Sequence, residues 1–176
     1  GVAQTELSAP KLFEKRKMDL KRIRAYVDQF SLIGVEGPWG DGKSFLWEWM
    51  RKDLSRSYEV VEISVLACNI DQLLPILVRD LTDILQKNSV FSCYSSRVEK
   101  LVAQSPKAEW FFRLMFPEPA GRSTILEGFQ KDLAKVKRPI IVMYEDLDRV
   151  EDARLISQIF AIAEKLQGPR LKVLYQ

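Results

Sequence analysis

The strongest constraint on this chain is the stretch from residue 37 to residue 44, which reads Gly-Pro-Trp-Gly-Asp-Gly-Lys-Ser. It fits the pattern G-x-x-x-x-G-K-[ST] at every position, a pattern typical of loops that bind phosphate. The residues at 31–36 predict a short strand before the loop, and those at 45–50 predict the start of a helix after it. A glycine-rich turn before an ordinary helix is the alternative, and the register of the glycines, the lysine and the serine disfavours it.

Several residues of this stretch have specific predicted roles. Glycines allow the backbone N–H groups of the loop and the helix N-terminus to converge on phosphate. Lys43 is expected to reach the β- and γ-phosphates of a nucleotide, and the Ser44 hydroxyl to bind Mg²⁺. Trp39 either packs over the loop or contacts the nucleotide. The predicted nucleotide contacts are Gly37, Pro38, Trp39, Gly40, Asp41, Gly42, Lys43, Ser44 and Phe45.

A second informative stretch begins with the apolar run Pro-Ile-Ile-Val-Met-Tyr at residues 139–144. Such a run is expected of a central parallel strand covered on both faces. It ends in Glu-Asp-Leu-Asp-Arg at residues 145–149. Acidic residues at the carboxyl end of a parallel strand face the crevice in which the phosphate-binding loop also lies. The alternative interpretation is a capped turn before the next helix, with Asp148 or Asp152 as the cap. A cap needs one carboxylate and does not explain several in a row after an apolar strand.

Strands and helices alternate along the rest of the chain, which predicts an α/β fold with a parallel sheet sandwiched by helices. We divide the chain into a basic helical segment at 1–30 and a core at 31–176, with a helical insert at about 88–121. The predicted strands are 31–36, 58–66, 139–144 and 171–175. The predicted helices are 11–29, 45–55, one that Asn69 or Asp71 caps and that ends at about 87, 96–104, 123–136 and 155–166.

Composition excludes some functions and leaves others open. The chain has no histidine, which excludes histidine-based catalysis and disfavours a zinc site. It has no run of eighteen apolar residues and no secretory signal, so we expect a soluble, cytoplasmic protein without a membrane span. The net charge of +3 does not by itself imply nucleic acid. Cations are dense between residues 11 and 24, however, and they indicate either a solvated helix face, which we favour, or a surface for nucleic acid or an acidic partner. The aromatic segment at 110–116 is expected to form a satellite core rather than an exposed patch.

Together the two stretches resemble the KAP family of P-loop NTPases. Residues 36–44, E-G-P-W-G-D-G-K-S, are close to the family's G-x-W-G-x-G-K-[ST], and residues 145–149, E-D-L-D-R, are close to its D-D-L-D-R. The resemblance covers most of the chain. It implies an ATPase of the additional-strand class that uses ATP and Mg²⁺, is often oligomeric and often acts in bacterial defence or membrane-associated signalling. On the same resemblance we expect the C-terminal part of the domain to be missing from this sequence.

The resemblance also assigns roles to the acidic residues. Lys43, Glu145 and Asp146 become the catalytic candidates, with Ser44 and Glu145 holding Mg²⁺ and Asp146 orienting the attacking water. Glu145 stands where the family usually has Asp, so hydrolysis is expected to be slow or the Mg²⁺ geometry shifted. Arg149 either pairs with a neighbouring carboxylate, which we favour, or reaches the nucleotide of another subunit. A polar residue near the end of the fourth strand is expected at or just beyond Gln176.

The predicted function is therefore that of an ATP-hydrolysing switch, which works as a homo-oligomer and acts on an effector or partner protein. A scaffold that holds ATP without turnover is the first alternative. A phosphotransferase ranks third, because the sequence shows no acceptor-binding constellation.

Overall fold

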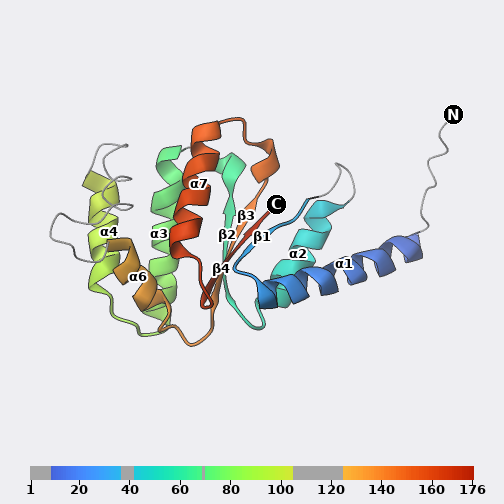
Figure 1. Ribbon diagram of the computed structural model, residues 1–176, viewed down its shortest axis with the longest axis horizontal. Coiled ribbons are helices and arrows are strands. Elements are labelled where there is room, and N and C mark those ends of the chain that lie inside the picture. Colours follow the sequence, from blue (N-terminus) through green and yellow to red (C-terminus); the bar gives the residue numbers. More distant parts are fainter. Residues whose placement is uncertain (1–8, 37–41, 69, 105–124) are drawn as a thin grey trace.

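The computed structural model describes residues 9–36, 42–68, 70–104 and 125–176. Four strands form one sheet in which all neighbouring strands are parallel. Their spatial order is β1-β4-β3-β2, so that β4 lies between β1 and β3 (Figure 1). β4 is thus an additional strand between them, as the family resemblance led us to expect. The strands are β1 (Leu32–Gly34), β2 (Glu59–Ser64), β3 (Ile140–Glu145) and β4 (Leu171–Tyr175).

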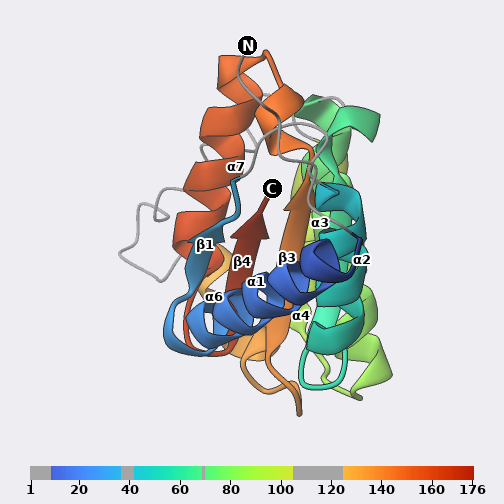
Figure 2. The same cartoon turned by 90° about the vertical axis from the view of Figure 1, so that its right-hand side faces the viewer.

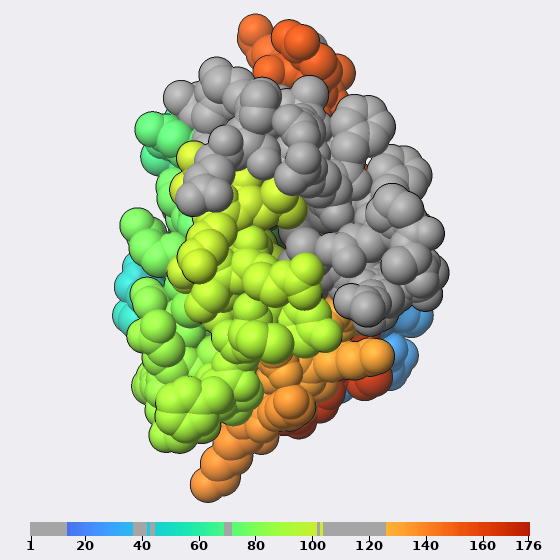
Figure 3. Space-filling view, turned by 90° about the vertical axis from the view of Figure 1, so that its left-hand side faces the viewer, coloured from blue at the N-terminus to red at the C-terminus, as the bar shows by residue number. Residues whose placement is uncertain are grey.

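Helices cover both faces of the sheet. On one face lie α1 (Ala9–Gln29) and α2 (Lys43–Leu54), with α1 outermost (Figures 1 and 2). The other face is covered by α3 (Ile70–Lys87), α6 (Ile125–Leu133) and α7 (Ala153–Leu166). Outside them α4 (Cys93–Gln104) packs on α3 and α6, and Figure 3 shows it in yellow-green on that side of the molecule. Two short 3₁₀ helices, η1 (Val65–Ala67) and η2 (Leu147–Arg149), follow β2 and β3.

The sheet separates two hydrophobic cores, and β3 contributes to both. Ile141 and Met143 lie in the core beneath α1 and α2, whereas Val142 and Tyr144 lie in the core beneath α3, α6 and α7. Successive side chains of a strand point to opposite faces. Glu145, two residues after Met143, therefore lies on the face that α2 covers.

The second half of α1 is fixed to the sheet by polar contacts as well as by its apolar face. Val27 is fully buried against the sheet. The buried Lys172 of β4 donates hydrogen bonds from Nζ to the backbone oxygens of Val27 and Phe30, at the end of the helix. Arg24 donates to the Ser57 hydroxyl at 2.8 Å, just before β2. These contacts hold α1 on β4 and on the turn before β2.

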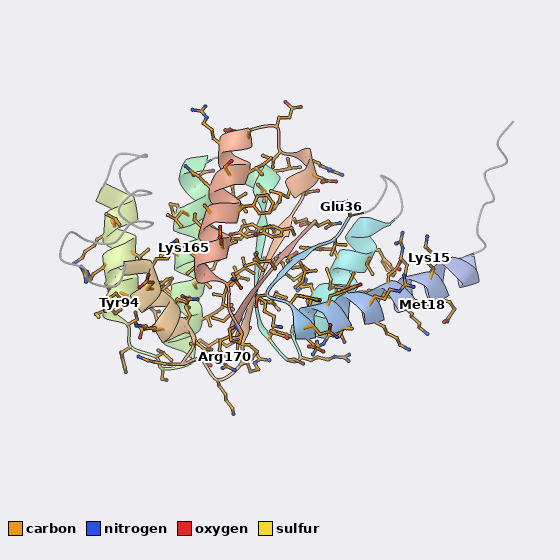
Figure 4. All side chains as sticks on the ribbon, viewed as in Figure 1. Lys15, Met18, Glu36, Tyr94, Lys165 and Arg170 are labelled. Atoms are coloured by element: carbon orange, nitrogen blue, oxygen red, sulfur yellow. The ribbon has the colours of Figure 1, made fainter. Side chains whose placement is uncertain are left out.

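Close packing between α4 and α6 depends on a glycine. A Cβ atom added at Gly128 would lie 2.4 Å from a carbon of the Tyr94 ring, much closer than packed atoms approach. Figure 4 labels Tyr94 on α4, beside α6. The glycine therefore leaves the space into which the tyrosine ring packs.

Most predicted elements are present, and several of their bounds are corrected. The strand predicted at 31–36 is shorter, because only Leu32–Gly34 pair with β4 as a strand. The strand predicted at 58–66 ends at Ser64, since residues from Val65 form η1. The helix predicted at 96–104 begins at Cys93. The helix predicted at 123–136 ends at Leu133, because the residues that follow form tight turns. The aromatic segment at 110–116 lies outside the described residues.

Among the helices that the structure describes, none has the length and apolar character required to span a membrane.

The pair between Arg138 and Glu59 provides a test of how β2 is held. Arg138 donates to the buried Glu59 carboxylate at 2.7 and 3.1 Å, and it lowers the pKa of Glu59. Arg138→Gln is expected to lower the free energy of unfolding at pH 7 by about 1–3 kcal/mol, because it leaves a buried carboxylate poorly paired. This loss should shrink as the pH falls through the pKa of Glu59, since the pair stabilises the fold only while the carboxylate is charged.

Urea denaturation of the two proteins at neutral and acidic pH measures this difference. The exposed Arg154, which lies 3.9 Å from Asp152, provides the control. Arg154→Gln is expected to change stability by less than about 0.5 kcal/mol. Equal losses of stability from the two substitutions would contradict the conclusion that the pair between Arg138 and Glu59 stabilises the fold.

Candidate functional site

The described part of the phosphate-binding stretch begins at Gly42, directly before α2. Gly42 has φ 72° and ψ 32°, a left-handed conformation that favours glycine. Among the described residues other than its chain neighbours, no atom lies within 4 Å of a Cβ atom added there, so it is the backbone conformation that favours glycine at this position. Its backbone oxygen accepts a hydrogen bond from the N–H of Leu46 at 3.1 Å, within the first turn of α2.

Five of the predicted nucleotide contacts cannot be placed in the structure. Gly37, Pro38, Trp39, Gly40 and Asp41 lie outside the described residues.

Lys43 and Ser44 are the first two residues of α2, and the structure describes their backbone. The first N–H groups of a helix have no partner within the helix and can bind an anion. Phe45 is 51% exposed, and its ring packs on Trp49 with 4.4 Å between the centroids.

The acidic stretch turns sharply at the end of β3. Glu145 is the last residue of the strand, and Asp146 has φ 63° and ψ 28°. A left-handed conformation is uncommon for a residue other than glycine, and Asp is among the residues that adopt it most readily. The turn is fixed by the N–H of Leu147, which donates to the backbone oxygen of Gln176 at 2.6 Å.

The end of β4 joins the two predicted halves of the site. The backbone oxygen of Tyr175 accepts a hydrogen bond from the N–H of Val35 at 2.8 Å, on the segment that enters the phosphate-binding loop. The next backbone oxygen, that of Gln176, accepts from Leu147 in the acidic turn. Two consecutive carbonyl groups therefore bind the loop entry on one side and the acidic turn on the other. Since neighbouring strands are about 4.8 Å apart, β1 and β3 are separated by about 10 Å.

Gln176 also contributes a polar side chain between these segments. Its Oε1 atom is buried and has no hydrogen-bond partner among the residues that the structure describes. Buried polar atoms are nearly always paired, so an unpaired amide oxygen at this edge indicates a place for a donor such as a water molecule. The family resemblance led us to expect a polar residue at or just beyond this position, and its role stays a prediction.

The charge of Glu145 is disfavoured by its surroundings. Burial has the largest effect in raising the pKa of the Glu145 carboxyl, and the negative charges of Asp146 and Glu62 raise it further. The positive charge of Arg149 has an opposing, smaller effect. Carboxylate oxygens are the ligands that Mg²⁺ prefers, and a cation beside Glu145 and Asp146 would offset their repulsion. Of the two predicted magnesium ligands, Ser44 and Glu145, the structure thus describes the side chain of Glu145, whose carboxylate has chemistry suited to the ion; the magnesium site stays a prediction.

The sequence analysis missed Glu62, which links this cluster to α2. It lies on β2 and accepts a hydrogen bond from Nε1 of Trp47 at 3.2 Å. Nε of Arg51 lies 3.3 Å from its other carboxylate oxygen. The rest of the Trp47 side chain is buried in the core beneath α1 and α2. A charged residue on a strand otherwise rich in β-branched residues was a signal that could have identified Glu62. Its partners Trp47 and Arg51 become evident only in the folded structure.

Two other charged residues have mainly local partners. Nε of Arg149 lies 3.4 Å from Oδ1 of Asp146, which confirms the pairing that the sequence favoured. Asp152 caps α7 by accepting a hydrogen bond from the N–H of Arg154 at 2.9 Å. The capped-turn interpretation therefore holds for Asp152 and leaves Glu145 and Asp146 for another role.

A cavity of about 870 Å³ lies beside the site, between the β1 edge and α7. Its lining includes Leu32, Glu36, Ile156, Phe160 and Tyr175. Tyr175 belongs to the core beneath α7, so the cavity lies on that side of the sheet, away from α2. Figure 4 labels Glu36 where the chain leaves β1.

Comparison with known proteins gives one finding. The family model of the KAP family P-loop domain matches residues 21–174. The chain belongs to this family. The match runs from the second half of α1 into β4, and it includes the phosphate-binding stretch, α2, β2 and β3; it ends just before Tyr175 and Gln176. Searches of curated proteins and of solved structures found no match. Membership of the KAP family indicates that the chain binds nucleotide.

The raised pKa of Glu145 makes the pH dependence of the KAP site testable. A carboxylate binds Mg²⁺ only when deprotonated. Affinity for nucleotide with Mg²⁺ is therefore expected to fall, on acidification, at a pH above the ordinary range of a glutamate. Glu62→Gln removes one of the charges that raise the pKa of Glu145, and it should move this loss of affinity to lower pH.

Arg51→Gln is the matched control, because it breaks the ion pair with Glu62 but keeps the charge of Glu62. Measurement of Mg²⁺-dependent nucleotide affinity as a function of pH gives the pH at which each of the three proteins loses affinity. A loss of affinity that occurs at the same pH in Glu62→Gln as in the unaltered chain would contradict the proposed coupling.

Proposed function

We propose that this KAP-family chain binds ATP with Mg²⁺ at the carboxyl edge of its sheet and hydrolyses it slowly. The observation that carries the proposal is the pair of hydrogen bonds at the end of β4, from Val35 to Tyr175 and from Leu147 to Gln176. They hold the entry to the phosphate-binding loop and the acidic turn at a fixed separation. Phosphoryl transfer to water depends mainly on such positioning and on neutralisation of charge.

In this proposal each residue acts on a different part of the reaction. Lys43 and the N–H groups of the loop bind the phosphate oxygens, while Ser44 and Glu145 hold Mg²⁺. The ion, when bound, supplies positive charge to the β- and γ-phosphates. Asp146 would accept a hydrogen bond from the water that attacks the γ-phosphorus. A bond forms between the water oxygen and the γ-phosphorus, the bond from the γ-phosphorus to the bridging oxygen of ADP breaks, and the protons of the water leave with the inorganic phosphate. Arg149, 3.4 Å away, holds the Asp146 carboxylate in place.

Slow turnover is proposed for a geometric reason. Glutamate at position 145 is one methylene longer than the aspartate usual at that position, and Mg²⁺ requires near-ideal octahedral geometry. The pairing of Asp146 with Arg149 also gives support to a second function, because it engages the carboxylate that would orient water. In that alternative the chain holds ATP without turnover as a scaffold. A phosphotransferase has no specific observation in its favour.

The biological role that we propose rests on the resemblance of the two motifs to the KAP family. The chain would act in the cytoplasm as a homo-oligomer whose conformation depends on the bound nucleotide. It would control an effector or partner protein in bacterial defence, including defence against phage, or in signalling.

Two substitutions separate hydrolysis from binding. Lys43→Ala is expected to weaken ATP binding at least about tenfold, because it removes the charge that faces the phosphates. Asp146→Asn should leave ATP affinity within a few fold and lower the turnover rate by about a hundredfold or more. Equilibrium binding of ATP and GTP with Mg²⁺, and release of phosphate, measure the two effects.

Lys52→Ala, on the same helix as Lys43 and paired with Glu48 at 2.8 Å, is the control and should bind ATP normally. The enzyme proposal is contradicted if the unaltered chain binds ATP but Asp146→Asn leaves release of phosphate unchanged. The switch proposal is contradicted if ATP binds without any change in the conformation or the size of the assembly.

A further inference from the structure

Positive charge in this chain is concentrated on α1. Residues 14–24 of the helix contain six lysines and arginines and only two acidic residues. The net charge of this segment is therefore +4, whereas that of the whole chain is +3. The remainder of the molecule thus carries a net charge of −1. Such local concentration of basic residues on one helix is the electrostatic signature of a surface that binds a polyanion.

Three of these cations have no acidic partner in the part of the chain that the structure describes. Arg16, Lys17 and Arg24 each lie within 3.6 Å of a carboxylate oxygen. By contrast, Lys15, Lys21 and Arg22 form no ion pair with any residue from the described ranges. All three side chains are exposed. Their charges are therefore available to a ligand.

The unpaired cations share one side of α1 with exposed apolar side chains. Lys15, Met18, Arg22 and Tyr26 follow each other at intervals of three and four residues, which places them in one row along a helix. Met18 is 58% exposed and Tyr26 is 54% exposed. Lys21 lies beside this row. We call these five residues, Lys21 included, the basic row of α1. Figure 4 labels Lys15 and Met18 on the part of α1 that extends away from the sheet.

We propose that the basic row of α1 binds nucleic acid. Lys15, Lys21 and Arg22 contact backbone phosphates, and Tyr26 stacks on an unpaired base. From residue 15 to residue 22 the helix advances about 10 Å, so the three cations can contact successive phosphates of one strand. Aromatic side chains among cations are typical of surfaces that bind single-stranded nucleic acid.

The opposite side of α1 argues against a lipid surface as the ligand. An amphipathic helix binds a membrane by burying its apolar face among the lipid chains. In α1 that face is already occupied, because Val27 is fully buried and Leu20 and Ile23 pack against the same core beneath α1 and α2. The basic row offers mainly charge, which suits a phosphodiester backbone.

The test uses fluorescence anisotropy with a labelled 20-nucleotide single-stranded DNA, without ATP. Binding is measured between 50 and 200 mM salt for the unaltered chain and for the triple variant Lys15→Gln, Lys21→Gln, Arg22→Gln. Loss of three phosphate contacts should reduce the slope of log affinity against log salt by about 2. We expect affinity at 100 mM salt to fall at least about tenfold.

A matched triple variant removes the same charge elsewhere. Lys100, Lys131 and Lys165 are exposed on α4, α6 and α7, on the other side of the sheet from α1. Their replacement by Gln should change affinity by less than about threefold, since only long-range attraction is reduced. Tyr26→Ala should weaken binding of the single strand about fivefold or more, and leave binding of a duplex of the same length nearly unchanged.

Several outcomes would overturn the proposal. Equal weakening of DNA binding in the two triple variants would show only a general effect of net charge. DNA binding by the triple variant of α1 that is as tight as that of the unaltered chain would also contradict the proposal. Binding of vesicles that contain phosphatidylserine, without binding of DNA or of RNA of the same length, would also contradict it. Lys43→Ala should retain DNA binding, so this result is independent of whether the chain hydrolyses ATP.

Discussion

The parallel pairing of β4 with both β1 and β3 is the constraint on which the candidate site depends. All five residues of β4 are buried, and its two neighbours run in the same direction. Parallel strands present their carboxyl ends at one edge of the sheet. The order β1-β4-β3 therefore brings the entry of the phosphate-binding loop and the acidic turn to the same edge, one strand apart. Without β4, Val35 and Leu147 would lose the shared partner that fixes their separation.

The charges around this edge extend the same organisation to α2. The helix that follows the phosphate-binding loop is joined to β2 through Glu62, which Trp47 and Arg51 both contact. Glu62 in turn raises the pKa of Glu145 at the end of β3. A movement of α2 on nucleotide binding would therefore alter the electrostatic surroundings of Glu145. This provides a physical route by which the two halves of a nucleotide site can influence each other.

The parts of the molecule that depend on local chemistry were predictable from the sequence. Gly42 adopts the left-handed conformation that its motif requires, and the apolar run before Glu145 forms the central strand. Other features depend on residues that are distant in the chain. The contacts of Glu62, the unpaired amide oxygen of Gln176 and the packing of Tyr94 against Gly128 follow from the order of the strands and the position of helices. No local pattern in the sequence specifies them.

In our proposal the start of α2 and the end of β3 bind one nucleotide and one metal ion. The most direct test is a crystal structure with a non-hydrolysable ATP analogue and Mn²⁺ in place of Mg²⁺, with the metal located by anomalous scattering. We predict one metal peak between the phosphates and the end of β3, bound to a Glu145 oxygen directly or through one water molecule. A nucleotide in the cavity between β1 and α7, or a metal ion remote from Glu145, would contradict it.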